Sequence, residues 1–392
     1  MTARHHDEPA PSPLPDLAGR TLGGSVMAAS DEFFAEKENL IKPEPPTHRP
    51  YTFAHRGQVY DGWETRRRRG PGPDRRPGAG DADWALVRLG VPGVLRTVVV
   101  DTAYFTGNFP PACTVQAAAA DELATPEQLA AADWAEIVPR CPLTGDARHI
   151  FEVSDPHRYT HLRLLIHPDG GVARLRAHGE PVPDPRPLAG LSFDLAALEN
   201  GGAVAACSDD YFGSPTNLLA PGLPRVMGEG WETRRRRDEG NDYVVVALAA
   251  AARLRLAEID TRHFLGNAPG SAALRAARAP GAAAPPPGAW TELLPRTALL
   301  PDTRHRFRLP ADAGELTHVR LDVYPDGGVA RLRLLGEPTP DGRRGLALRW
   351  LNALPPGAFV RTAAAEWGLP AGEAAELAAA RPFTRQPDRL PI

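Results

Sequence analysis

The octapeptide Gly-Trp-Glu-Thr-Arg-Arg-Arg-Arg occurs twice in this chain, at Gly62–Arg69 and again at Gly230–Arg237. Eight identical residues in two copies do not arise by chance, so the chain contains an internal duplication. Each copy places one acidic residue beside four guanidinium groups. A hydrophobic core needs apolar residues, so a polar string kept in both copies points to recognition or chemistry.

Three other strings recur in the same order, which predicts two tandem domains. The spacing from the octapeptide to the following Asp-Thr string is longer in the first copy. The extra residues fall in Gly70–Gly80, a Pro, Gly and Arg stretch typical of a surface loop. Two copies are too few, and the period too long, for a solenoid. The recurring pairs are Ala28–Phe34 with Ala206–Phe212, Asp101–Asn108 with Asp260–Asn267, and His167–Arg176 with Tyr324–Arg333.

Composition limits the class of protein. A length of 392 residues accommodates two domains of roughly 150 residues each. A net charge of −3 gives no reason to expect nucleic acid or an anionic membrane as partner. Cys113, Cys141 and Cys207 form no metal pair and no disulfide framework, as in a reducing cytoplasm. No apolar run is long enough to span a bilayer, and the polar, Pro-rich start lacks the core of a signal peptide.

Strand patterns dominate both copies. Val94–Asp101 is rich in β-branched residues. Apolar residues alternate over His161–His167 and again over Val319–Val323, and each stretch is followed by Pro-Asp-Gly-Gly. We expect a β-hairpin at each of these turns, because Pro presets φ and Gly accepts a positive φ. Many short strands and few helices favour an antiparallel β-sandwich in each copy.

Helices are expected in two places. Thr125-Pro126-Glu127-Gln128 has the Thr, Pro and Gln of a helix start, and Gly372–Ala380 is an Ala, Glu and Leu segment near the end. The predicted organisation is a disordered leader over residues 1–21, a first repeat over 22–180, a Pro-rich linker over 181–190, a second repeat over 191–338 and a helical tail over 347–392.

The number, order and spacing of these motifs resemble the allantoicase family. The resemblance covers about Leu22 to Pro338; the two Gly-Trp-Glu-Thr-Arg and the two Asp-Thr-x-x-Phe-x-Gly-Asn strings are its most specific parts, and Ser30–Leu40 also fits. It implies an all-β fold of two tandem jelly-roll-like (galactose-binding-like) antiparallel β-sandwich domains, here with a short helical C-terminal tail. It also implies hydrolysis of allantoate to ureidoglycolate and urea. The tail faintly resembles the start of the ureidoimidazoline decarboxylases, although a helical tail packed on the second domain or on another subunit is the simpler interpretation.

Several polar residues suit a substrate with one carboxylate and two ureido groups. Guanidinium grips a carboxylate through two parallel hydrogen bonds, and a carboxamide both donates to and accepts from a ureido group. An exposed strand edge with weak ion pairs is the alternative interpretation of the arginine run. The substrate-binding candidates are Arg66, Arg67, Arg234, Arg235, Asn108 and Asn267.

The same resemblance defines a set of catalytic candidates. Cleavage of a C–N bond at the carbon bearing both ureido groups needs an acid for the departing urea and a base for water. The aspartates are equally suited to cap the loop backbone, and His263 is replaced by Tyr104 in the first copy. The catalytic candidates are Glu64, Glu232, Asp101, Asp260 and His263.

Metal and cofactor signals are missing from the sequence. It has no His-x-His, no His-Glu-x-x-His and no phosphate-binding loop, so we expect neither metal nor cofactor. We expect a small-molecule substrate and a homo-oligomer, with no nucleic-acid or membrane partner. The alternative function is a non-enzymatic tandem β-sandwich module that binds an acidic sugar or a ureide, because sandwiches host both roles.

Overall fold

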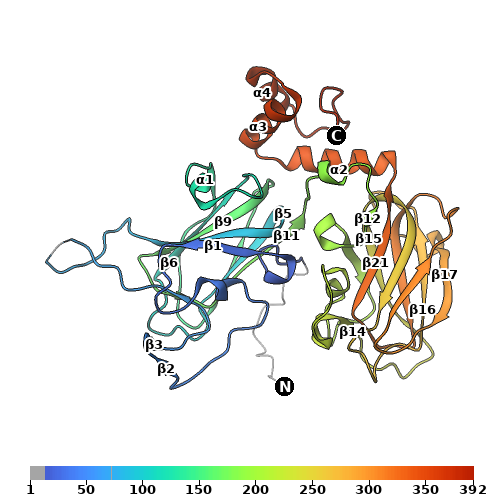
Figure 1. Ribbon diagram of the computed structural model, residues 1–392, viewed down its shortest axis with the longest axis horizontal. Helices are drawn as coiled ribbons and strands as arrows, with labels where there is room; N and C mark the ends of the chain where they lie inside the picture. Colours follow the sequence, from blue (N-terminus) through green and yellow to red (C-terminus); the bar gives the residue numbers. More distant parts are fainter. Residues whose placement is uncertain (1–13, 72) are drawn as a thin grey trace. The chain divides into compact units, whose positions relative to one another are not determined.

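The computed structural model describes residues 14–71 and 73–392. The chain divides into two compact units, Met1–Glu180 and Pro181–Ile392, and each contains one copy of the repeated motifs (Figure 1). Within the described residues, no helix has both the length and the apolar character needed to cross a membrane.

Unit one is built almost entirely of strands. Its elements are η1 (Arg20–Leu22), β1 (Ser25–Ala29), η2 (Lys37–Ile41), β2 (Phe53–Ala54), β3 (Gly57–Gln58), β4 (Trp63–Glu64), β5 (Asp83–Asp101), β6 (Ala112–Ala118), α1 (Pro126–Ala130), β7 (Trp134–Pro142), β8 (Arg148–Glu152), β9 (Arg158–His167), β10 (Gly171–Val172) and β11 (Arg174–Pro181).

Unit two repeats this order and adds three helices at its end. Its elements are η3 (Arg186–Leu188), β12 (Phe193–Asp194), η4 (Leu198–Asn200), β13 (Ala203–Cys207), η5 (Pro215–Leu219), η6 (Met227–Glu229), β14 (Trp231–Glu232), β15 (Asp242–Asp260), β16 (Ser271–Ala277), η7 (Pro287–Ala289), β17 (Thr291–Ala298), β18 (Arg304–Arg308), β19 (Leu316–Tyr324), β20 (Gly328–Val329), β21 (Arg331–Pro338), α2 (Pro340–Ala353), α3 (Pro356–Trp367) and α4 (Ala371–Ala379).

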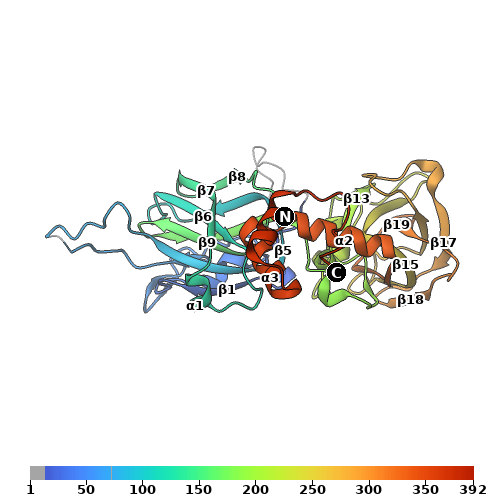
Figure 2. The same ribbon diagram turned by 90° about the horizontal axis from the view of Figure 1, so that it is seen from above.

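One long strand links the two layers of each sandwich. The first half of β5 pairs with β1 and β9, and its second half pairs with β8 and β11. The register between β5 and β9 shifts between Arg88 and Gly93, where the strand passes from one layer to the other. A Cβ on Gly93 would lie 2.3 Å from the carbonyl oxygen of Glu180, so only glycine permits this approach. Beyond β9 the first layer continues through β6 to β7 (Figure 2).

Unit two has the same topology, with β15 in the place of β5. This strand pairs with β13, β19, β18 and β21, and its register to β19 shifts between Ala247 and Ala252. Apolar side chains fill the interior in alternation, as with Leu162 and Leu164 of β9 and Leu321 of β19, all fully buried. The predicted fold class, two tandem antiparallel β-sandwiches with a short helical tail, is confirmed.

The predicted hairpin at each Pro-Asp-Gly-Gly turn is wrong. Strand β9 is already paired along both edges, with β5 on one side and β6 on the other, so the next strand cannot fold back onto it. The chain instead crosses to the other layer, where β11 pairs with the second half of β5. On the way, β10 pairs with β4, the start of the octapeptide. The turn therefore brings the chain against the octapeptide.

Two segment boundaries also differ from the expectation. Leu17 and Ala18 are fully buried, and the Leu17 N–H donates to the Ala177 carbonyl, so residues 14–21 belong to the folded unit. The remainder of the predicted disordered leader, residues 1–13, lies outside the described residues. The helical tail starts at Pro340 rather than at 347, because the Thr339 hydroxyl accepts from the Gly342 N–H and caps α2. The predicted Thr125 cap of α1 is confirmed, with Gln128 completing the reciprocal pair.

Candidate active sites in the two repeats

Each octapeptide begins as a two-residue strand anchored by its tryptophan. Trp63 of β4 is fully buried, and its indole N–H donates to the carbonyl oxygen of Asp31 at 2.7 Å. Trp231 of β14 makes the same bond to Asp209 at 2.8 Å. With tryptophan held in the interior, the next residue, Glu64 in repeat one, projects from the opposite face of the strand.

A buried phenylalanine explains why the glycines recur around this strand. Phe105 of the Asp-Thr string is only 1% exposed. A Cβ on Gly171 would lie 2.1 Å from its ring, and one on Gly62 would lie 2.7 Å away. Phe264 is enclosed in the same way in repeat two, where a Cβ on Gly328 would lie 1.9 Å from the ring. Only glycine allows the Asp-Thr loop to pack this closely against the octapeptide.

That packing brings a glutamate and an asparagine together in each repeat. The Asn108 amide donates to Glu64 Oε1 at 2.8 Å, and the Asn267 amide donates to Glu232 Oε1 at 2.6 Å. Glu64 is 9% exposed, and burial raises the pKa of its carboxyl, while the bond from Asn108 partly opposes this rise. A carboxyl in this environment holds its proton at higher pH than a surface glutamate does.

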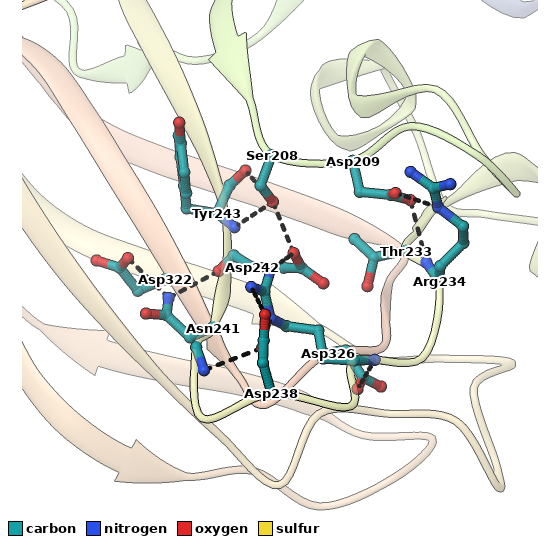
Figure 3. Close-up of polar contacts among 12 residues, drawn as sticks. Ser208, Asp209, Thr233, Arg234, Asp238, Asn241, Asp242, Tyr243, Asp322 and Asp326 are labelled. Atoms are coloured by element: carbon teal, nitrogen blue, oxygen red, sulfur yellow. Dashed lines mark hydrogen bonds and ion pairs between the residues drawn. The ribbon is translucent and has the colours of Figure 1, made fainter.

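The first arginine of each run is held by an aspartate. Arg66 donates its backbone N–H to Asp31 Oδ1 at 2.9 Å and its Nε–H to Oδ2 at 2.6 Å. Arg234 grips Asp209 in the same way, with Nε at 2.6 Å from Oδ2 (Figure 3). Burial would raise the pKa of Asp31, but bonds from two backbone N–H groups and the guanidinium bring it below its ordinary value. The sequence analysis did not select Asp31 and Asp209, although their recurrence beside Ser30 and Ser208 was the available signal.

The other arginines of the run divide into paired and unpaired groups. Arg68 donates to the buried Asp83 at 3.0 Å, and Arg236 bridges Asp238 and Asp242 at 2.8 Å each. Figure 3 labels Asp238 and Asp242. Arg67 and Arg235, by contrast, are exposed and make no hydrogen bond or ion pair to any residue that the structure describes. They can therefore accept an anionic ligand without breaking an internal ion pair.

The two predicted catalytic aspartates lie at strand ends and bind their own loops. Asp101 is 7% exposed and accepts from the Ala103 N–H at 2.8 Å. Asp260 accepts from the backbone and the guanidinium of Arg262. Burial raises the pKa of Asp101, while the Ala103 N–H and the Arg148 charge oppose the rise. Within the described residues neither carboxylate bonds to Glu64 or Glu232, so the geometry matches loop capping, and a catalytic role stays a prediction.

His263 and its counterpart Tyr104 share an unusual backbone conformation. Their φ angles are 70° and 68°, in the left-handed region. His263 Nε2 lies 3.0 Å from the Pro224 carbonyl oxygen, and because a carbonyl only accepts, Nε2 carries a hydrogen. Tyr104 instead stacks on His48, with ring centroids 5.1 Å apart. The two repeats therefore differ chemically at this position.

Comparison with known proteins places this double β-sandwich, with its two Glu–Asn pairs, in a family. The allantoicase repeat model matches residues 15–182 and 193–339, and the chain therefore belongs to the allantoicase family. The helices beyond residue 339 lie outside this match.

Relatives match over most of the chain. The chain is 56% identical over 326 residues to a probable allantoicase of Nocardia farcinica, covering 83% of this chain and 94% of that protein. It is 51% identical to a probable allantoicase of Streptomyces coelicolor, covering 85% and 88% of the two chains. The crystal structure of allantoicase from Saccharomyces cerevisiae superposes with a TM-score of 0.67 at 33% identity, covering 82% of this chain and 92% of that one.

Proposed function

We propose that this protein is an allantoicase that hydrolyses allantoate to ureidoglycolate and urea. The observation that carries the site assignment is the buried carboxyl of Glu64, held by the Asn108 amide at 2.8 Å and repeated as Glu232 with Asn267. Membership of the allantoicase family over both repeats supports the reaction.

The chemistry requires one proton to be donated and one to be recovered. Protonated Glu64 gives its proton to the departing ureido nitrogen as the C–N bond breaks and urea leaves. The lone pair of the remaining ureido nitrogen stabilises the cationic carbon. Water then adds to this carbon and returns a proton to the Glu64 carboxylate, giving ureidoglycolate. The reaction consumes one water molecule for each urea released. In repeat two, Glu232 would have the role that Glu64 has in repeat one.

The remaining candidates would bind and orient the substrate. Arg66 or Arg67 in repeat one, and Arg234 or Arg235 in repeat two, would hold the carboxylate. Asn108 and Asn267 would fix the carboxyl of the neighbouring glutamate and use their remaining amide atoms on the ureido group. Asp101 and Asp260 would shape the loop that carries these asparagines, and His263 would contact the reacting ureido group in repeat two.

We propose further that the protein acts as a homo-oligomer in the cytoplasm. Exposed apolar side chains in the loops of repeat two, among them Leu223, Val226 and Leu265, support subunit association. Cys113, Cys141 and Cys207 are free thiols, which suits a reducing compartment. Light scattering of the purified protein tests the first part, and a monomeric mass at micromolar concentration would refute it. Cell fractionation tests the second.

Urea release from purified protein tests the activity. Allantoate should yield one urea and one ureidoglycolate per turnover, and allantoin, which lacks a free carboxylate, should stay intact. A double variant, Glu64→Gln with Glu232→Gln, controls for contaminating activity and should release no urea above background. Should wild-type protein bind allantoate in calorimetry yet release no urea, with or without added divalent metal, the binding-module alternative replaces the enzyme.

A further inference from the structure

Repeat one carries a hairpin that repeat two lacks. Strands β2 and β3 pair Phe53 with Gln58, and Arg56 lies in the turn between them. The corresponding connection in repeat two contains only the short helices η5 and η6. Arg56 lines a cavity of about 620 Å³ that is widely open to solvent, together with Arg66, Phe33 and residues of the loop from Ala29 to Glu38. A volume of this size suits a small organic ligand.

Most charges around this cavity are already paired. Asp31 pairs with Arg66 at 2.6 Å, Glu32 pairs with Lys37 at 3.2 Å, and Glu38 pairs with Arg20. Two lining groups are left without an ion-pair partner among the described residues. These groups are the guanidinium of Arg56 and the carboxylate of Glu36.

The two unpaired groups differ in how they are held. Arg56 donates a single hydrogen bond, to the neutral carbonyl of Phe33 at 3.2 Å. Its guanidinium carbon lies 5.5 Å from the centroid of the Phe33 ring, the same distance as that of Arg66. Two cations beside one ring, with only one of them neutralised by a carboxylate, leave a position for an anion. Glu36 precedes η2 without using its side chain as a cap.

We propose that this cavity binds the substrate in repeat one, with Arg56 and Arg66 on its carboxylate and Glu36 on a ureido group. The inference rests on the function proposed above and adds a specificity-determining residue, Arg56. A carboxylate needs a guanidinium, and the N–H groups of a ureido function need an acceptor, so the two unpaired groups match both ends of such a ligand. Repeat two has no equivalent of the Arg56 hairpin.

Glu64 precedes Arg66 by two residues; Arg66 lines this cavity, whereas Glu64 is not among the lining residues. Glu64 is buried like Trp63 and Thr65 and is held by Asn108, whereas Arg66 is exposed at the cavity. Residues two apart in an extended chain are about 7 Å apart. In the proposed binding mode, a ligand whose carboxylate rests on Arg66 extends from there toward the carboxyl of Glu64.

Steady-state kinetics with allantoate test the role of Arg56. Arg56→Ala should raise KM at least about tenfold while kcat stays within about twofold, because the contact acts on binding rather than on the breaking bond. Arg56→Lys keeps the charge but loses the planar fork, so its KM should lie between those of wild type and Arg56→Ala. Arg76→Ala removes an exposed arginine from the Gly70–Gly80 loop and should match wild type. If KM of Arg56→Ala stays within twofold of wild type, the inference is wrong.

Binding of N-carbamoylglycine, which carries one carboxylate and one ureido group, tests the site without catalysis. In calorimetry, N-carbamoylglycine should bind to wild-type protein. It should bind about tenfold more weakly to Arg56→Ala and to Glu36→Gln. The neutral N-carbamoylglycinamide should bind to wild-type protein much more weakly than N-carbamoylglycine does. Urea release by wild type together with unchanged N-carbamoylglycine affinity in both variants would overturn the inference and leave the function intact. Binding that depends on Arg56 in a protein that releases no urea would overturn the function and leave the site.

Discussion

The protonation of Glu64 is set by two opposing contacts. Burial raises the pKa of its carboxyl, and the hydrogen bond from Asn108 lowers it by stabilising the charged form. If protonated Glu64 is the acid, kcat falls as pH rises through this pKa. The position of that alkaline limb therefore reports the balance between burial and the asparagine.

Asn108→Ala should move the alkaline limb to higher pH. Removing the donor leaves burial unopposed, so the pKa of Glu64 rises further. The pH profile of kcat with allantoate measures this shift. Asn267→Ala is the matched control in repeat two and should leave the alkaline limb in place. If the alkaline limb of the kcat profile stays in place in both Asn108→Ala and Glu64→Gln, a group other than Glu64 controls it.

At the residue scale, the sequence predicted which polar side chains would recur but not how they would pair. Glu64 and Asn108 are 44 residues apart in the sequence. They come into contact because Phe105 packs against Gly171, a tertiary contact that the sequence does not reveal. Asp31 was visible as a repeated residue, yet nothing local connects it with Arg66, 35 residues later. Duplication shows that a residue is retained, whereas its partner depends on the tertiary fold.

At the scale of elements, the short pairing of β4 with β10 depends on the space left by glycine. A Cβ at Gly171 would lie 2.1 Å from the Phe105 ring, which is 1% exposed. The β4–β10 pairing, the burial of the Phe105 ring and the Glu64–Asn108 hydrogen bond therefore depend on one another.

Gly171→Ala should destabilise repeat one by about 3 kcal/mol or more, since overpacking of a rigid site is costly. Gly107→Ala is the matched control in the same region, because a Cβ there would meet nothing within 4 Å. Thermal unfolding followed by circular dichroism should give a clearly lower Tm for Gly171→Ala alone. Equal Tm values for both variants would show that the ring moves aside and that the contact does not limit stability.

The strands themselves were predicted better than their connections. Alternating apolar residues marked β9 and β19 correctly, because burial on one face leaves a period of two. The Pro-Asp-Gly-Gly turns gave a wrong pairing, because local turn chemistry contains no information about strands that already occupy both edges of β9. The long strand β5 was recognised only in its second half, since Gly90, Pro92 and Gly93 interrupt its pattern where it bends.

At the scale of the whole molecule, duplication gives two sites that have since diverged. Repeat one has the nearly buried Glu64, the Arg56 hairpin and Tyr104. Repeat two has His263 tied to the Pro224 carbonyl, and its Asn267 also contacts the Met227 sulfur at 3.3 Å. In repeat two, internal contacts thus occupy polar atoms of His263 and Asn267 that a ligand could otherwise use. We therefore expect repeat one to catalyse the reaction.

Single Glu→Gln variants distinguish the repeats. Glutamine keeps the shape and the contact with asparagine but cannot transfer a proton, so loss of a general acid should lower kcat by about a hundredfold or more. We expect this loss in Glu64→Gln and near wild-type turnover in Glu232→Gln, with both variants folded to the same Tm within a few degrees. The reverse pattern would move catalysis to repeat two and would make the His263 site the productive one. If turnover survives in both single variants and in the double variant, the recurring glutamate is structural and the acid must be sought at Asp101 or Asp260.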